Sequence, residues 1–350
     1  MFFMNYDLEK MVPEDHPLRT IKDRFPAEEI ASRREEWKKC LGREGYGMEV
    51  GLKALFLQFW GDYSDREMED RLRYDISYKW FCGFKMEDST PDHTFFCRAR
   101  KNLGEKRIEE LFDKINQDEQ LRKIAKKVGV FVDASAIRRK EAEWKKRDED
   151  KEKEQEDIED AIRKSKEAFE KEEKAKRDAA LNVPQGNKAA PGTFSGDKEA
   201  RWGCKGGKKY WFGYKRHVSV DIASGLIEKV WVTPANVNDA AAFKFVCPTE
   251  TRVLADRGYD TEDVRRILKQ KRCEDGVMRL TRRKDFDKER NKEISKKRAP
   301  WEHVFSKMSR RTRYMGVKKT YLQALMEAIV HNMKRLVLLE GLTPAVIGLS

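Results

Sequence analysis

The 350-residue sequence predicts an α+β or α/β protein, in which an N-terminal helical domain precedes a mixed β-sheet with helices. Two observations predict this class: apolar residues recur at helical spacing over the first 125 residues, and short β-branched runs begin near Val128. We expect a helical domain over residues 1–125 and a sheet domain over residues 126–320. A charged helical insertion with a loop interrupts the sheet domain at residues 138–200, and a C-terminal helix over residues 321–350 packs on it.

The helical domain is predicted from aromatic stripes and from start signals. Apolar residues between Val50 and Phe59 form one stripe, which ends at Gly61. Ser64 and Glu67 have the spacing of a capping box and predict the start of the next helix. Thr90 followed by Pro91 predicts an N-cap with proline in the first helical position. We expect the aromatic residues of these stripes to form the core of this domain.

The sheet domain begins with a β-branched run that we expect to end at Asp133. Residues 138–180 are about three-quarters charged with mixed signs, which predicts a solvated helix or helical hairpin. A tract rich in Gly, Pro and Asn at 182–192 predicts a loop. The remaining elements are a hairpin (210–221 with 226–233), a strand ending at Asp256, a helix (261–271), a strand (276–281), an amphipathic helix from Pro300 and a closing helix from Leu322.

The charge balance favours a polyanionic partner. The chain has 75 Lys and Arg against 62 Asp and Glu, a net charge of +13. Residues 261–320 hold 21 basic and 9 acidic side chains, so this segment carries nearly all of the excess. We therefore expect nucleic acid rather than a membrane surface as the partner. The helical domain is nearly neutral and would bind DNA through local patches such as Arg71 with Arg73, or Arg98, Arg100 and Lys101.

The sequence indicates a cytoplasmic protein. No stretch approaches the roughly 18 apolar residues of a membrane span, and the first residues lack the pattern of a signal peptide. The six cysteines include no pair at C-x-x-C spacing, which argues against a zinc knuckle or a disulfide framework.

Three carboxylates could support metal-dependent chemistry. Asp133 and Asp256 each follow a predicted buried strand, and Glu302 falls in the first turn of the predicted helix from Pro300. Carboxylates at neighbouring strand ends can converge on hard cations such as Mg²⁺. A third ligand would complete a site for two ions about 4 Å apart, which needs no protein nucleophile. Each aspartate could instead be only a turn or helix cap.

At this point the sequence resembles a known family, the bacterial insertion-sequence transposases with an Asp-Asp-Glu triad, in the insertion-sequence-five type group. The similar strings occur in family order from about residue 8 to 340: Val-Pro-Glu-Asp-His-Pro-Leu-Arg19, Phe-Val-Asp133-Ala-Ser, Gly213-Tyr-Lys-Arg-His-Val-Ser-Val-Asp221, Thr-Pro-Ala-Asn-Val-Asn-Asp239, Ala-Asp256-Arg-Gly-Tyr and Trp-Glu302-His-Val-Phe. The resemblance implies a ribonuclease-H-like catalytic domain in which Asp133, Asp256 and Glu302 are the catalytic residues and bind two Mg²⁺ or Mn²⁺ ions.

The resemblance also implies the reaction and the partners. The helical domain would recognise the inverted repeats of a mobile element. The catalytic domain would nick the element end and use the freed 3′-hydroxyl to attack target DNA. The partner is double-stranded DNA, both as element ends and as target, and by analogy the protein acts as a homodimer on DNA. It would be associated with the bacterial nucleoid, with no membrane contact.

Several basic residues are candidates for DNA contacts. Residues 205–211 combine basic and aromatic side chains in a predicted loop, and the segment around Glu302 is strongly basic. The candidates are Lys205, Lys208, Lys209, Lys215, Arg298, Lys307, Arg310, Arg311 and Arg313. His303 and His217 could contact phosphate, although the metal scheme needs no histidine base. Asp221 and Asp239 could have either structural turn roles or catalytic ones.

Two other functions remain open at this stage. A metal-dependent nuclease of the same fold would cut DNA without joining it. A catalytically silent, transposase-derived protein would bind DNA only, and the presence of all three carboxylates argues against it.

Overall fold

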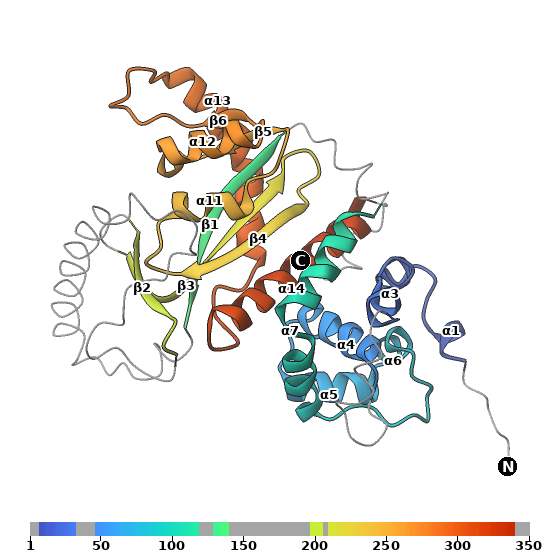
Figure 1. Ribbon diagram of the computed structural model, residues 1–350. Helices are drawn as coiled ribbons and strands as arrows, with labels where there is room; N and C mark the ends of the chain where they lie inside the picture. The colour runs from blue at the N-terminus through green and yellow to red at the C-terminus, as the bar shows by residue number, and fades with distance from the viewer. Residues whose placement is uncertain (1–6, 33–45, 119–128, 140–196, 206–208, 340–350) are drawn as a thin grey trace, which may run out of the picture. The chain divides into compact units, whose positions relative to one another are not determined.

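The computed structural model describes residues 7–32, 46–118, 129–139, 197–205 and 209–339 (Figure 1). The side chains of Ser32, Lys209 and residues 301–303 are also outside this description. Most of the predicted charged insertion and the loop at 182–192 therefore lie outside the described residues. The chain forms two compact units. Unit 1 comprises residues 1–129, 220–228 and 322–350, and unit 2 comprises residues 130–219 and 229–321.

The N-terminal part of unit 1 is helical in its described residues. Its N-terminal helices are α1 (Leu8–Met11), α2 (Pro17–Lys22), α3 (Ala27–Ser32), α4 (Met48–Trp60), α5 (Asp65–Tyr74), α6 (Ile76–Cys82) and α7 (His93–Asn116). The predicted capping box is confirmed, because Ser64 and Glu67 each accept a hydrogen bond from the other's backbone. The predicted N-cap at Thr90 is wrong: Asp92 caps α7 by accepting from Phe95 N at 3.1 Å, since a carboxylate two residues later satisfies the free amide.

Aromatic side chains form the core of unit 1, as predicted. The Phe25 and Phe56 rings lie 4.8 Å apart, and Phe81 packs against Phe56 at 5.7 Å. Arg100 is not part of an exposed patch, because its guanidinium donates to both carboxylate oxygens of Asp65 at 2.7 and 2.6 Å. This pair joins α5 to α7 inside the unit.

The hairpin tip and the last helix complete unit 1. Helix α14 (Val317–Leu339) has the buried apolar stripe predicted for the closing helix. Its Asn332 is fully buried and bonds the backbone of Ile227 through both Oδ1 and Nδ2 at 2.8 Å. Asn332 also donates to Asn116 of α7 at 2.8 Å. The tip of the hairpin is thereby bound to α7 and α14.

A mixed sheet is the framework of unit 2. Its strands are β1 (Val130–Arg138), β2 (Arg201–Lys205), β3 (Lys209–Asp221), β4 (Ile227–Pro234), β5 (Arg252–Ala255) and β6 (Glu274–Val277). The strand order is β2-β3-β1-β5-β6, and β4 pairs with β3 (Figure 1). Strands β1, β5 and β6 are parallel, whereas β2 and β3 are antiparallel. This mixed sheet confirms the coarse fold class.

Strand β1 does not end at Asp133 as predicted but continues to Arg138. The sequence Asp-Ala-Ser is typical of a turn, yet neighbouring segments hold it extended. Arg138 N donates to Arg310 O at 2.7 Å, and Thr312 N donates to Arg138 O at 2.8 Å. The last predicted strand is also shifted toward the N-terminus, since β6 ends at Val277.

The two faces of the sheet have different coverings. Val130 and Val132 point into an apolar core with helices α11 (Asp239–Val246) and α12 (Glu262–Gln270). Phe131 points to the other face, because side chains alternate along a strand. There its ring meets Phe305 edge-on at 6.4 Å and lies 4.9 Å from the Arg298 guanidinium.

The segment around Glu302 differs from the prediction. Helix α13 spans Lys288–Arg298, and a 3₁₀ segment, η5, follows over Ala299–Lys307. Glu302 therefore does not lie in the first turn of an α-helix that begins at Pro300. The sequence pattern missed α13 because its many charged residues leave only Asn291, Ile294 and Arg298 buried.

In the described part of the chain, no helix is both long and apolar enough to cross a membrane.

Candidate active site

The structure brings Asp133 and Asp256 together. Strands β1 and β5 are parallel, with Val130 opposite Val253 and Phe131 opposite Leu254. Continuing this register by two residues puts Asp133 opposite Asp256. Both carboxylates lie on the same face of the sheet as Phe131 and Leu254. The core under α11 and α12 is on the other face. Burial raises the pKa of Asp133, and the negative charge of Asp256 raises it further.

Asp133 sits in a restricted environment. Its side chain is 23% exposed, its Oδ1 accepts from Ala134 N at 2.8 Å, and its Oδ2 lies 3.5 Å from Nη2 of Arg298. Burial raises the pKa of Asp133 to about 6, although the Ala134 amide and Arg298 act in the opposite direction. A nearby cation would stabilise the charged form of this carboxylate.

Asp256 is positioned by the turn that follows β5. It is the N-cap of the 3₁₀ turn η4 (Arg257–Tyr259), and its Oδ1 accepts from Gly258 N at 2.8 Å. A side chain at Gly258 would place its Cβ only 3.0 Å from this oxygen. Among the described residues, the other carboxylate oxygen of Asp256 accepts no hydrogen bond. The turn therefore fixes one oxygen and leaves the second available to a ligand.

The backbone of Glu302 passes the same face of the sheet. Arg298 precedes it and contacts Asp133, while Phe305 follows it and packs on Phe131. Both flanking residues thus contact β1 at or next to Asp133. The side chain of Glu302 lies outside the described residues.

The donor set fits a hard divalent cation. Asp133 and Asp256 supply carboxylate oxygens, the ligand type that Mg²⁺ and Mn²⁺ prefer. Burial disfavours the charge on Asp133, and a bound cation would offset that unfavourable charge. Within the described residues, no group of three or more Asp, Glu, His or Cys side chains is arranged to hold a metal ion. The third predicted ligand, Glu302, has its side chain outside them.

Tyr259 is a residue near this site that sequence reasoning missed. It is 1% exposed, and its hydroxyl has no hydrogen-bond partner among the described residues. Burial raises the pKa of Tyr259, and the charges of Asp239, Asp133 and Asp256 raise it further. The string Ala-Asp256-Arg-Gly-Tyr contained it, but spacing alone gave no reason to separate it from the core aromatics.

Three of the basic candidates lie close to the site or inside the fold. Burial raises the pKa of Asp133, and the positive charge of Lys205, at the exposed end of β2, partly opposes this rise. Lys205 therefore acts on the site. Lys215 instead donates to Asp239 at 2.8 Å and to Val237 O at 2.9 Å, with only 15% of its side chain exposed. Arg298 is buried against Asp133.

The other basic candidates follow η5 or fall outside the described part. Lys307, Arg310 and Arg311 are exposed, and Arg313 is half-buried. Lys208 is outside the described residues, and Lys209 is described only by its backbone as the first residue of β3.

His217 and Asp221 are integrated into the hairpin. His217 is 1% exposed and lies 2.9 Å from Thr233 Oγ1, and burial lowers the pKa of His217 to about 4. Asp221 is fully buried and accepts from Ser224 N at 2.8 Å in the turn. Asp239 begins α11 and pairs with Lys215. The side chain of His303 lies outside the described residues.

Comparisons with known proteins match two regions of the chain to transposase families. Residues 6–102 match the family model described as "Transposase domain (DUF772)", and residues 124–333 match the model described as "Transposase DDE domain". The chain is 34% identical over 172 residues to the transposase for insertion sequence element IS1106 of Neisseria meningitidis serogroup B. That alignment covers 45% of this chain and 59% of the relative, so the chain spans less than two thirds of the relative's length. No solved structure matches the chain significantly.

Proposed function

Because the chain belongs to the transposase DDE domain family, we propose that it catalyses DNA transposition. In this proposal the enzyme cuts DNA at the ends of its mobile element and joins the freed ends to target DNA. The catalytic domain is ribonuclease-H-like, and the insertion-sequence-five type group is the proposed subfamily.

The juxtaposition of Asp133 and Asp256 is the observation that carries this proposal. They lie opposite each other in the register of the two central parallel strands, with both side chains on the same face of the sheet. Burial raises the pKa of Asp133 and the charge of Asp256 adds to this rise, as expected for two carboxylates that share a site. A purely structural cap would not need a second carboxylate beside it.

We propose that Asp133, Asp256 and Glu302 bind two Mg²⁺ ions, which Mn²⁺ can replace. When bound, such ions activate an attacking water or hydroxyl and stabilise the leaving oxygen of a phosphodiester. The chain's own residues prepare this site. The Gly258 amide orients Asp256, the Ala134 amide orients Asp133, and Arg298 balances the charge of Asp133.

The DNA partners follow from the two matched regions. We assign recognition of the inverted repeats to the helical domain and chemistry to the sheet domain, with the protein acting as a homodimer that brings two ends together. Exposed Lys205, Lys307, Arg310 and Arg311 are the proposed phosphate contacts around the site. Lys215 and Arg298 have structural partners, so we remove them from the proposed DNA contacts.

A cleavage and joining assay tests the proposal. Purified protein is incubated with duplex DNA that carries the terminal sequences flanking its gene, with Mg²⁺ or Mn²⁺, and with uncut or pre-cut ends. We expect cleavage of the uncut DNA and joining of the pre-cut ends to a target plasmid. Asp133→Asn, Asp256→Asn and Glu302→Gln should abolish both steps while DNA binding is retained.

The outcomes separate the alternative functions. Cleavage without joining would indicate a nuclease instead of a transposase. DNA binding with no cleavage, unchanged by the three substitutions, would indicate a silent DNA-binding protein.

A further inference from the structure

We propose that the exposed lysine row of α13, defined as Lys288, Lys292 and Lys296, binds the phosphates of duplex DNA beside the candidate active site. This inference rests on the proposed function, because it assigns a surface to the same DNA substrate. None of the three residues is among the sequence-based DNA-binding candidates.

The geometry of α13 puts the three lysines on one side of the helix. They recur every four residues, which is close to one helical turn and about 6 Å along the axis. All three are exposed. The buried residues Asn291 and Ile294 lie on a different side of the helix, turned toward the sheet. The row is therefore a continuous solvent-facing strip about 12 Å long.

The row leads toward the candidate active site. At the N-terminal part of α13, Arg290 donates to Val277 O and Asp275 O of β6 at 2.9 and 2.8 Å. At the C-terminal end, Arg298 lies against Asp133 of β1. The helix thus crosses from the edge strand to the catalytic strand, and Lys296 lies two residues before the one that contacts Asp133.

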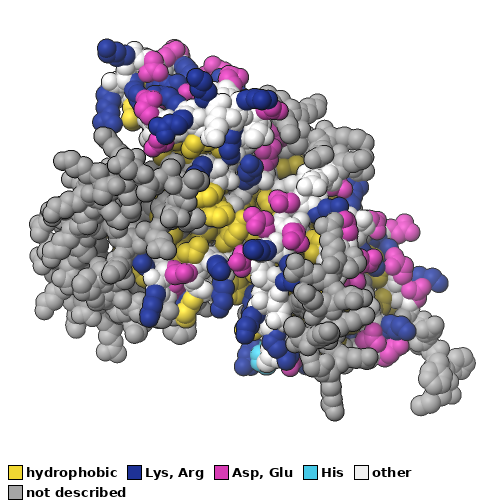
Figure 2. Space-filling view, in the orientation of Figure 1, with side chains coloured by type: hydrophobic (Ala, Val, Ile, Leu, Met, Phe, Trp, Pro, Cys, Tyr) yellow, Lys and Arg dark blue, Asp and Glu magenta, His cyan; other side chains and the backbone are white. Residues whose placement is uncertain are grey.

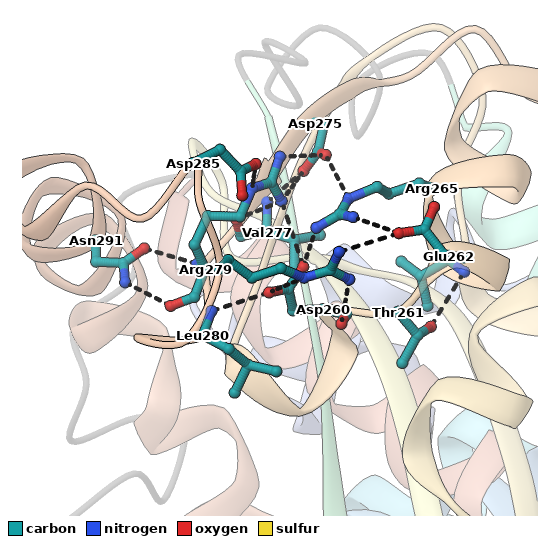
Figure 3. Close-up of polar contacts among 12 residues, drawn as sticks. Asp260, Thr261, Glu262, Arg265, Asp275, Val277, Arg279, Leu280, Asp285 and Asn291 are labelled. Atoms are coloured by element: carbon teal, nitrogen blue, oxygen red, sulfur yellow. Dashed lines mark hydrogen bonds and ion pairs between the residues drawn. The ribbon is translucent and has the colours of Figure 1, made fainter.

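An ion-pair network holds the segment before α13 in place (Figure 3). Asp260 has a fully buried side chain and interacts with Arg265, with Arg279 at 3.8 Å and with Arg283 at 3.4 Å. Asn291 bonds both the N–H and the C=O of Arg279 at 2.8 Å, which ties this network to α13. The start of the lysine row is therefore fixed to the sheet.

The same network shows where the positive charge of this segment is available. Arg265, Arg279, Arg283 and Arg290 are engaged by acidic side chains, namely Asp260, Glu262, Asp275 and Asp285. These arginines are largely neutralised and serve the fold. Asp260 lies outside residues 261–320, so within this segment the four arginines face three of these acidic groups and account for +1 of the excess of +12. The remaining +11 resides on other side chains. Figure 2 shows Lys and Arg side chains interspersed with acidic ones over the region of β6, α12 and α13.

The row itself is only weakly compensated. In the described part of the chain, its one ion pair joins Lys292 to Glu289 at 4.0 Å, and both side chains are more than 60% exposed. Glu293 also lies beside the row, but it pairs with Lys297 at 2.5 Å. Exposed ion pairs of this kind contribute little to stability, so another anion easily replaces the carboxylate. Among the described residues, Lys288 and Lys296 form no ion pair. Three solvated ammonium groups in line beside a carboxylate site fit the backbone of a DNA strand better than an acidic protein, since the site's chemistry acts on phosphodiesters.

The spacing of the row is compatible with a DNA strand. Phosphates of one strand advance by about 3.4 Å along the duplex axis per nucleotide, so the 12 Å row spans about three nucleotide steps. The contacts would hold the DNA that flanks the reacting phosphate and would not read its sequence. We therefore expect them to affect affinity rather than the choice of cleavage site.

The test compares two triple variants of the full-length protein. The first is Lys288→Gln, Lys292→Gln, Lys296→Gln. The matched control is Arg266→Gln, Lys269→Gln, Arg272→Gln, which removes the same charge from α12 and the residues after it. Helix α12 packs on the other face of the sheet through Val264 and Leu268. Affinity for a duplex carrying the terminal sequences is measured between about 50 and 200 mM salt.

We expect the α13 variant to lose at least about tenfold in affinity at low salt, and its log–log salt slope to fall by about 2–3. The control should change far less, and both variants should keep the wild-type melting temperature. An α13 variant that binds DNA like wild type, or like the control, would overturn the proposal. Loss of binding to an acidic polypeptide with DNA affinity unchanged would assign the row to a protein partner and would also overturn it.

The binding test is independent of catalysis. If the wild-type protein binds DNA but does not cleave it, the proposed function fails while the salt slopes still report on the row. If the wild type cleaves, the α13 variant should approach the wild-type rate at saturating DNA, because the row contacts phosphates away from the carboxylates.

Discussion

Replacing Asp133 with Asn should stabilise the metal-free protein while it abolishes catalysis. Burial destabilises the charged form of Asp133. This destabilisation exceeds the stabilisation that the Ala134 amide and Arg298 give to the charge. Asn has nearly the same shape and carries no charge. The substitution therefore removes the unfavourable charge but also removes a proposed metal ligand, which is the expected exchange between stability and function at an active site.

The magnitude follows from the pKa of Asp133, which rises from 3.8 to about 6 on folding. The folded protein binds this proton more tightly than the unfolded chain, so the contribution to stability is complete below pH 3.8 and is lost as the pH rises through 6. A shift of about two pH units corresponds to about 3 kcal/mol. The Asp133→Asn variant should thus match the wild type near pH 4 and exceed its free energy of unfolding by about 3 kcal/mol at pH 8.

Urea unfolding at pH 4, 6 and 8 in the presence of EDTA measures this difference. Adding Mn²⁺ at pH 8 should stabilise the wild type, which binds the ion in its folded state, and leave the variant unchanged. A variant that is less stable than the wild type at pH 8 without metal would refute the reasoning, because Asp133 would then be a stabilising ion-pair partner of Arg298.

Three further predictions concern the framework of the site. Gly213 has φ +148°, and a Cβ there would lie 2.2 Å from Ile137 O. Gly213→Ala should therefore lower the free energy of unfolding by at least about 3 kcal/mol in urea titrations. An equally stable variant would contradict the close approach. Burial lowers the pKa of His217 from 6.5 to about 4, so this imidazole contributes a loss of about 2 kcal/mol between pH 7.5 and 5. The loss is measured as the change with pH in the stability difference between the wild type and His217→Gln, and a difference that stays constant with pH would contradict it. Ser64→Ala removes the cap of α5 and should destabilise unit 1 by about 1 kcal/mol in thermal unfolding, whereas no change would mean that the capping box is not stabilising.

The sequence predicted elements best where the local signals and the packing agree. The hairpin, strand β5, helix α12 and the buried stripe of α14 all have clear apolar periodicity, and the structure confirms them. Strand β1 was predicted too short because Asp-Ala-Ser resembles a turn, whereas β3 and the distant segment at residues 310–312 keep it extended. Helix α13 was missed because it is held by polar contacts, such as Asn291 with Arg279, that leave no apolar pattern.

The sequence predicted the carboxylates of the candidate site, but it did not separate basic side chains held inside the fold from exposed ones. Asp133 and Asp256 could be proposed because each follows a short apolar run, and parallel pairing then places them side by side. The same reasoning proposed five basic residues around Glu302 as DNA contacts, namely Arg298, Lys307, Arg310, Arg311 and Arg313. Only the three-dimensional contacts separate Arg298, which balances Asp133, and Arg279, which is bound by Asp275 and Asp285, from the exposed lysines of α13.

Binding of Mn²⁺ is the most direct test of the claim that Asp133 and Asp256 form a metal site. The titration is followed by electron paramagnetic resonance at pH 8 on wild type, Asp256→Asn and the control Asp263→Asn, whose carboxylate is 77% exposed on α12. We predict that Asp256→Asn weakens Mn²⁺ binding at least about tenfold, since it removes one charged ligand of a hard cation, while the control binds like wild type. Equal Mn²⁺ affinity in Asp256→Asn and wild type would contradict the metal site.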